Sequence, residues 1–228
     1  MKYQGKLIVI EGGDGSGKTT QATLLLKYLK DKGIPHSSLD FPQYDSFYGK
    51  IVAQFLRGEF GDLKSVSPYL AALTFALDRF AVKDDIVQCL KRGEIIVANR
   101  YVTSNIAHQG SKFTDKAKRK KFIAWLEELE YGFHGLPHED VVLWLHVSSK
   151  ITEALTKMKD KRSYLQGKED IQERDRSHQN STEILYNTLS QQYKHWITIP
   201  CFQNDTIKSK EEIHKTIVQA LIKKGIVK

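Results

Sequence analysis

The fold of this chain is decided by one stretch, Gly12-Gly13-Asp14-Gly15-Ser16-Gly17-Lys18-Thr19. An apolar run, 7–10, precedes it and a second apolar pattern, 21–26, follows it, so the order is strand, glycine loop, helix. Gly12 and Gly17 stand five apart with Lys18 and Thr19 directly after them, which is the spacing of a phosphate loop. The alternative is a glycine turn that only joins a strand to a helix, and the complete motif in its required context argues against it.

Backbone N–H groups in such a loop form an anion nest at a helix N-terminus, where the helix dipole adds partial positive charge. Lys18 is expected to reach the β- and γ-phosphates of ATP, and the Thr19 hydroxyl is expected to ligate Mg²⁺. The predicted ATP-binding residues are Gly12, Gly13, Asp14, Gly15, Ser16, Gly17, Lys18, Thr19 and Thr20.

Beyond the loop, short apolar runs alternate with helical patterns. After 7–10, strands are expected at 37–41, 95–98, 140–147 and 198–201, and helices at 46–57, 68–92, 114–130, 149–159, 182–194 and 209–222. This alternation predicts an α/β fold, a five-stranded parallel sheet with helices on both faces, in one domain over residues 1–228. Ligands are then expected at the carboxyl ends of the strands.

Composition narrows the class of protein further. The hydrophobic content of 40% is ordinary for a globular chain, and no apolar stretch approaches the roughly twenty residues that span a bilayer. Cys89 and Cys201 each lie in an apolar pattern, which favours buried thiols over a disulfide. We therefore expect a soluble, cytoplasmic protein with no membrane partner.

The net charge of +8 admits a nucleic-acid partner or polyphosphate substrates. The densest basic cluster, 116–121, lies on the predicted helix 114–130, where a solvated helix face is the simpler reading than a binding patch. Zinc-finger spacing and RNA-binding signatures do not occur in the sequence. Charge alone therefore does not argue for nucleic acid, and none is expected as a partner.

Several separated motifs together make the chain resemble the thymidylate kinases. They are 12–19, Phe41-Pro42-Gln43-Tyr44, Gly58-Glu59-Phe60-Gly61-Asp62-Leu63, Phe75-Ala76-Leu77-Asp78-Arg79, Asn99-Arg100-Tyr101-Val102-Thr103-Ser104-Asn105 and Glu173-Arg174-Asp175. The resemblance implies transfer of the γ-phosphate of ATP to dTMP, giving dTDP, with Mg²⁺ and usually in a homodimer. It covers nearly the whole chain.

Phe75 and Arg79 stand four apart on one face of a predicted helix. The resemblance implies that Phe75 stacks on the thymine ring, while Arg79 hydrogen-bonds the base near the phosphates. Considered alone, the two residues are more simply read as a core phenylalanine and half of an exposed pair between Arg79 and Asp78, and the surrounding motifs reverse that preference.

Arg100 follows a buried strand directly, an expensive place for an unpaired cation. A phosphate partner would resolve that cost, and so would a structural ion pair. The resemblance implies that Arg100 binds the dTMP phosphate and the transferring group.

The other substrate-binding residues come from the resemblance as well. Tyr44 would contact the monophosphate, Phe41 would shape the pocket wall, and Asp14 would accept a hydrogen bond from the sugar 3′-hydroxyl. A short helix would carry the remaining residues beside the base, where an amide can offer a donor and an acceptor: Ser104, Asn105 and His108, with Gln109 a pocket neighbour or a helix cap.

Two positions depart from the family pattern. Asn99 stands where aspartate is usual, and it loses a charge that could attract magnesium-bound water or orient Arg100. His108 stands where many relatives carry a tyrosine that disfavours a ribose 2′-hydroxyl. Two alternatives therefore stay open: a nucleoside or nucleoside monophosphate kinase with another acceptor, and a weakly active nucleotide-binding regulator.

The charged segment 157–176 resembles the family's lid. Because Gly15 replaces an arginine found in the loop of some relatives, the lid is expected to supply a catalytic cation. Arg162 is the first choice, followed by Lys161 and Arg174, and the predicted catalytic set is Lys18, Arg100 and Arg162. Glu173 would lie near the sugar or metal-bound water.

Overall fold

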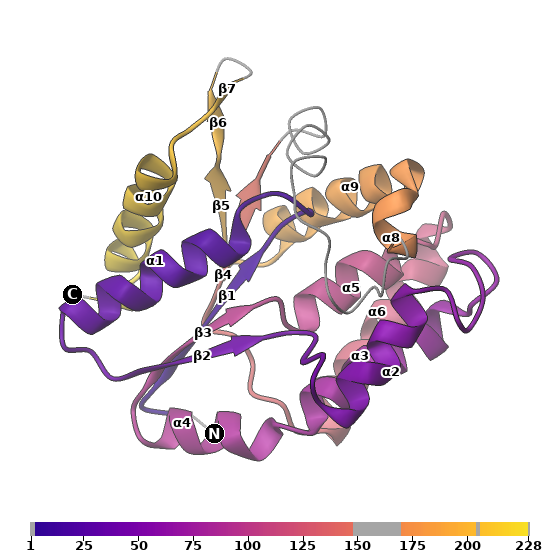
Figure 1. The fold of residues 1–228 in the computed structure, drawn as a ribbon, viewed down its shortest axis with the longest axis horizontal. Helices are drawn as coiled ribbons and strands as arrows, with labels where there is room; N and C mark the ends of the chain where they lie inside the picture. The colour runs from indigo at the N-terminus through magenta and orange to yellow at the C-terminus, as the bar shows by residue number, and fades with distance from the viewer. Residues whose placement is uncertain (1–2, 148–169, 204–205, 228) are drawn as a thin grey trace.

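The computed structural model describes residues 3–147, 170–203 and 206–227. Within this part of the chain, five parallel strands form one sheet in the order β2-β3-β1-β4-β5 (Figure 1). Their bounds are Lys6–Glu11 (β1), His36–Asp40 (β2), Ile95–Asn99 (β3), Val141–His146 (β4) and Trp196–Pro200 (β5). The predicted five-stranded parallel α/β fold is confirmed.

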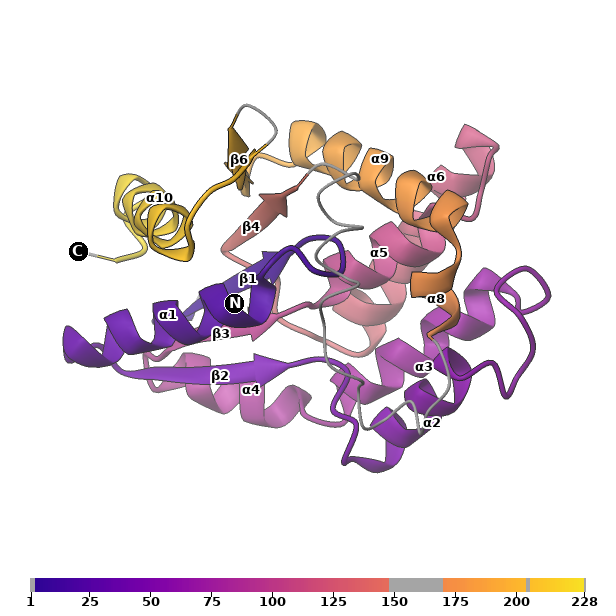
Figure 2. The same cartoon turned by 45° about the horizontal axis from the view of Figure 1, so that its top comes forward.

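Helices bury both faces of the sheet. Leu7 and Val9 of β1 pack into one core cluster, whereas Ile8 and Ile10 pack into another, as alternating side chains of a strand must. Helices α1 (Lys18–Asp31) and α10 (Lys210–Lys223) lie side by side over the second cluster (Figures 1 and 2). The opposite face is covered by α4 (Lys83–Lys91), α6 (Lys116–Glu127) and α9 (Arg176–Gln192).

A smaller helical group lies beyond the carboxyl ends of β2 and β3 (Figure 1). It contains α2 (Phe47–Leu56), α3 (Pro68–Phe80), α5 (Val102–Gly110) and the short helix α8 (Ile171–Arg174). Phe55 and Leu56 of α2 share an apolar cluster with Ile171 of α8, so residues distant in sequence form one wall.

The predicted continuous helix over 68–92 is wrong, because α3 ends at Phe80 and α4 begins at Lys83. Helix α3 packs against α2 and α5, whereas Ile86 and Leu90 of α4 pack against the face of the sheet that carries Leu7 and Val9. A single straight helix cannot contact both, so the chain turns between them.

Two further helix predictions need correction. The helix expected at 182–194 begins at Arg176, where the Asp175 side chain caps the N-terminus by accepting from the His178 N–H at 3.1 Å. Part of the segment assigned to the lid is therefore α8 and the start of α9. The helix expected to end at residue 130 changes to a π-helix, η1 (Glu128–Phe133), after α6. The helix expected at 149–159 lies outside the described residues.

Three smaller features complete the fold. Strands β6 (Phe202–Gln203) and β7 (Thr206–Ile207) form an antiparallel ribbon that the sequence did not predict. Both cysteines are free thiols, Cys201 buried as expected and Cys89 half-buried. Over residues 3–147, 170–203 and 206–227, the helices lack the combination of length and apolar character that crossing a membrane requires.

We expect Gly49→Ala to destabilise the fold. A Cβ at Gly49 of α2 would overlap the backbone carbonyl of Gln43, which cannot swing away as a side chain can. The free energy of unfolding should fall by about 1–3 kcal/mol, measured by urea denaturation. Gly132→Ala is the control, because its nearest neighbour would be Glu128 Cγ at 3.8 Å. Equal effects of the two changes would contradict this packing argument.

Candidate active site

The phosphate loop joins β1 to α1 in a conformation that requires glycine. Gly12, Gly15 and Gly17 have φ values of 151°, 83° and 89°. A Cβ at Gly12 would also lie 2.9 Å from the backbone oxygen of Leu145 on β4. The loop therefore presents its backbone at the first turn of α1, which starts at Lys18.

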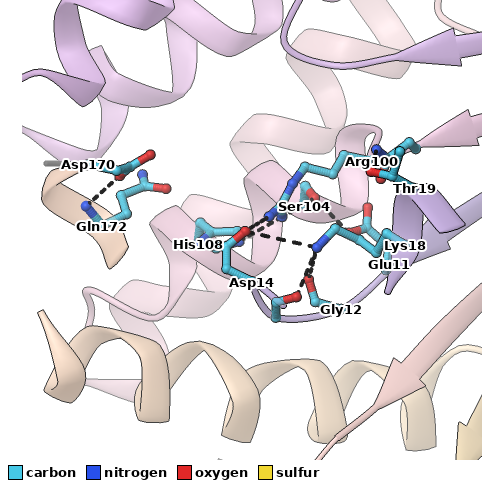
Figure 3. Close-up of polar contacts among 12 residues, drawn as sticks. Glu11, Gly12, Asp14, Lys18, Thr19, Arg100, Ser104, His108, Asp170 and Gln172 are labelled. Atoms are coloured by element: carbon cyan, nitrogen blue, oxygen red, sulfur yellow. Dashed lines mark hydrogen bonds and ion pairs between the residues drawn. The ribbon is translucent and has the colours of Figure 1, made fainter. Parts of the chain in front are cut away.

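The side chain of Lys18 folds over the phosphate loop and contacts its backbone. Its Nζ donates to the carbonyl oxygens of Gly12 and Gly13, each at 2.9 Å, and stands 4.0 Å from an Asp14 carboxylate oxygen (Figure 3). Thr19 is exposed, and its Oγ1 accepts a hydrogen bond of 3.4 Å from Asn99 Nδ2. A cation and a hydroxyl are thus placed side by side at the start of α1.

Glu11, the last residue of β1, is completely buried and is a site residue that the sequence reasoning missed. Its carboxylate accepts from Tyr101 N at 3.2 Å, Thr103 Oγ1 at 2.7 Å, Ser104 Oγ at 2.6 Å and Tyr186 OH at 2.8 Å. The available signal was an acidic residue at the end of a continuous apolar run, where a buried charge needs donors. This network fixes the turn after β3.

Arg100 occupies that turn with a left-handed φ of 66°. Its N–H donates to Ile10 O at 3.1 Å, its Nη2 donates to Asp14 Oδ1 at 2.7 Å, and its Nη1 donates to Ser104 Oγ at 3.3 Å (Figure 3). Burial lowers the pKa of Arg100, but the surrounding charges, of which Asp14 contributes the most, together raise it above its ordinary value. Arg100 therefore carries a charge beside the phosphate loop.

His108 lies against the same guanidinium, with its Nε2 at 3.1 Å from Arg100 Nη1. Burial and the positive charge of Arg100 hold the pKa of His108 well below its ordinary value. The imidazole is therefore neutral at pH 7, and its Nε2 accepts from Arg100.

Arg79 is buried, and the alternative that placed it in an exposed pair with Asp78 is wrong. Its Nε and Nη2 donate to the two carboxylate oxygens of Glu130, both at 2.6 Å. Asn105 Nδ2 donates to Glu130 Oε1 at 3.1 Å and to Ala72 O at 3.0 Å. Glu130 lies in the π-helix η1, and its role was not predicted.

Asp78 instead holds the loop that follows β2. Its carboxylate accepts from Gln43 N at 2.9 Å and from Ser46 Oγ at 3.1 Å. This loop carries Tyr44, and the neighbouring Phe41 is buried with its ring 6.2 Å from that of Tyr101.

A cavity of about 420 Å³ brings most of the predicted residues together. Its lining includes Asp14, Gly15, Gly17, Lys18, Thr19, Thr20, Asp40, Phe41, Tyr44, Phe75, Arg79, Asn99, Arg100, Ser104, Asn105, His108, Gln109, Asp170 and Gln172. Gly12, Gly13 and Ser16 belong to the phosphate loop but do not line this cavity, and Asp40, Asp170 and Gln172 were not predicted.

Several buried amide atoms on this wall have no hydrogen-bond partner among the described residues. They are Asn99 Oδ1, Asn105 Oδ1, both amide atoms of Gln109, and Gln172 Nε2. Buried polar atoms are nearly always paired, so a group of unpaired ones beside a cavity indicates a polar ligand. Phe75 supplies an apolar surface to the same cavity, with its ring 5.9 Å from that of Phe55.

The remaining predicted residues fall on the segment before α9. Arg162 and Lys161 lie outside the described residues. Glu173 and Arg174 belong to α8, but their side chains are outside the described part of the structure.

A parallel sheet whose central strand leads through a glycine loop into a helix, with a cation and a hydroxyl at that helix start, defines a phosphate-loop nucleotide-binding protein. The cavity beside it adds an arginine, an aromatic ring and free amides, which suit a nucleotide as the second ligand.

Comparison with known proteins gives the family. The model of the thymidylate kinase family matches residues 10–217, so the chain belongs to the thymidylate kinase family of phosphotransferases. Thymidylate kinase from Mycobacterium tuberculosis is 33% identical over 187 residues, covering 82% of this chain and 86% of the relative. Thymidylate kinase from Plasmodium falciparum is 29% identical, covering 97% and 92%.

A solved structure of thymidylate kinase from Candida albicans has a TM-score of 0.75, covering 99% of this chain and 95% of that one. Its sequence identity is 22%, so this similarity concerns the fold.

Glu130→Gln should destabilise the protein strongly, because it leaves the buried Arg79 charge unpaired. We expect a loss of about 3–5 kcal/mol in the free energy of unfolding, measured by urea denaturation. The matched control is Asp31→Asn, which breaks an exposed ion pair with Lys27 and should change stability little. A small effect of Glu130→Gln would show that the pair is not needed to hold Arg79.

Proposed function

We propose that this chain transfers the γ-phosphate of ATP to dTMP, giving dTDP and ADP, with Mg²⁺. Besides membership of the family, one observation supports this proposal. A single cavity is lined by Lys18 and Thr19, by Arg100, and by Phe75 and Asn105. A phosphate donor and a nucleotide acceptor can therefore meet in one cavity.

Phosphoryl transfer of this kind depends on positioning and charge neutralisation, and the protein supplies no nucleophile. The acceptor's own phosphate oxygen attacks in line. The loop N–H groups and Lys18 bind the donor phosphates, and Arg100 binds the acceptor phosphate and the transferring group. Because Asp14 and Ser104 already orient Arg100, little reorganisation is needed when charge develops.

The acceptor's base and sugar occupy the other end of the cavity. Phe75 stacks on the base, while the unpaired amide atoms of Asn105 and Gln109 offer hydrogen bonds to its polar edge. Asp14 accepts from the sugar 3′-hydroxyl, and Tyr44 contacts the monophosphate. His108 limits a ribose 2′-hydroxyl at this acceptor site less strictly than a tyrosine would.

The donor set near Thr19 fits Mg²⁺. The Thr19 hydroxyl, the unpaired Asn99 Oδ1 and the Asp40 carboxylate are hard oxygen ligands on one wall of the cavity. Mg²⁺ is usually held by one or two protein oxygens together with substrate phosphates and waters. When bound, the ion neutralises charge on the donor phosphates. Arg162 and Glu173 remain predictions for the lid, and a cytoplasmic location remains an expectation.

We also propose a homodimer formed through α3. Leu70, Leu73, Leu77 and Phe80 recur at spacings of three and four residues on this helix and are exposed or half-exposed. A stripe at this spacing is the seam by which two helices pack. A second copy of the chain would cover it.

The first test is coupled ADP release with ATP and Mg²⁺, offering dTMP, dUMP, UMP, dGMP and thymidine separately. We expect turnover on dTMP, and a fall of at least about a hundredfold in kcat/KM for Arg100→Lys, because lysine lacks the fork that grips a phosphate. Arg92→Ala, at an exposed ion pair outside the cavity, is the control and should match the wild type. Turnover on another acceptor alone would refute the dTMP assignment.

The dimer predicts that Leu73→Asp combined with Leu77→Asp gives a monomer in sedimentation velocity, because two carboxylates would be buried in the seam. The wild type should sediment as a dimer. Ile222→Asp, at an exposed site on α10, is the matched control and should leave the dimer intact. A monomeric wild type would refute the proposal.

A further inference from the structure

Two polar residues meet at the carboxyl ends of β2 and β3. Asp40 ends β2, Asn99 ends β3, and the two are direct partners in the strand register. Both line the cavity together with Thr19. Asp40 is an exposed residue on the cavity wall, whereas Asn99 is nine-tenths buried.

Hydrogen bonds determine how the Asn99 amide is oriented. Its Nδ2 donates to Asp40 Oδ1 at 2.9 Å and to Thr19 Oγ1 at 3.4 Å. An ionised carboxylate can only accept, so the amide nitrogen must face Asp40. Asn99 Oδ1 is then left buried with no partner among the described residues. Asn99 thus links the carboxylate of Asp40 to the hydroxyl of Thr19.

Of the acidic side chains on the cavity wall, Asp40 is the one connected to Thr19. Asp14 is bound by Arg100 at 2.7 Å, and Asp170 accepts from Gln172 N at 2.8 Å beside α8, away from the phosphate loop (Figure 3). The carboxylate that can act on a ligand beside the start of α1 is therefore that of Asp40 on β2.

This arrangement also makes residues 40 and 99 interdependent. An aspartate at 99 would place two carboxylates in the hydrogen-bonding contact now made by an amide and a carboxylate, and such like charges repel. An acid at 40 therefore goes with an amide at 99. Equally, an asparagine at 40 would suit an aspartate at 99, since the donor and acceptor are simply exchanged across the same strand pair.

We propose that Asp40 is the carboxylate that binds the water shell of the nucleotide-bound Mg²⁺, and that Asn99 is the positioning residue that holds Asp40 toward Thr19. The proposal rests on the use of Mg²⁺ and ATP in the proposed function. Asn99 Oδ1, otherwise unpaired, accepts from the same water shell. In this arrangement the carboxylate lies on β2, one strand away from β3, and position 99 carries the amide.

The first experiment measures metal binding rather than turnover. Mn²⁺ is titrated into enzyme held in excess over a non-hydrolysable ATP analogue, and free Mn²⁺ is counted by electron paramagnetic resonance. Asp40→Asn should weaken Mn²⁺ binding by about 10- to 100-fold, as loss of an outer ligand does. Asp45→Asn removes the same charge from an exposed position in the following loop and should bind Mn²⁺ as the wild type does.

The second experiment exchanges the two side chains. In thermal unfolding without ligand, Asn99→Asp should lower Tm by roughly 2–4 °C through carboxylate repulsion. The double variant Asp40→Asn with Asn99→Asp should recover both Tm and Mn²⁺ affinity, because the amide–carboxylate pair is restored in reverse.

Three outcomes would overturn the proposal: wild-type Mn²⁺ affinity in Asp40→Asn, equal weakening in Asp45→Asn, or a double variant that recovers Tm but not Mn²⁺ affinity. The last would show that the pair serves only to join the strands. None of these readings needs dTMP, so failure of the proposed acceptor assignment is seen separately in the substrate panel.

Discussion

A carboxylate without solvent contact, Glu11, sets the arrangement of the site, because burying its charge requires donors from several directions. One donor is the Tyr101 N–H in the turn after β3, two are the hydroxyls of Thr103 and Ser104 at the start of α5, and the fourth is the hydroxyl of Tyr186 on α9. The central strand, the turn and α9 are thereby tied at one point. Arg100 lies within that turn, so its left-handed backbone and its contact with Asp14 follow from the same constraint.

The cationic side chains at the site already have hydrogen-bond or ion-pair partners within the protein. Arg79 is held by Glu130, Arg100 by Asp14, and Lys18 by two carbonyl oxygens of its own loop. Pairing offsets part of the cost of burying these charges and fixes where they point. Lys18 and Arg100 remain on the cavity wall, so incoming phosphates need only compete with existing partners.

Parallel strands collect polar side chains at one edge, and the identity of each depends on its neighbour across the pair. Asp40 and Asn99 show this at the carboxyl ends of β2 and β3, where one acid and one amide share a hydrogen bond. The role of either residue therefore has to be judged together with the residue beside it in the adjacent strand.

Residue spacing within short segments was enough to predict the phosphate loop, the alternation of strands and helices, and Arg100 at a strand end. The partners of the buried charges could not be predicted in this way, because they depend on how distant segments pack. Glu130 lies 51 residues from Arg79, and Asp40 lies 59 residues from Asn99, so local patterns contain no trace of either pair. The break between α3 and α4 has the same origin, since it depends on which surfaces each half must cover. Local geometry follows from nearby residues, whereas the pairing of buried charges follows from how distant segments pack.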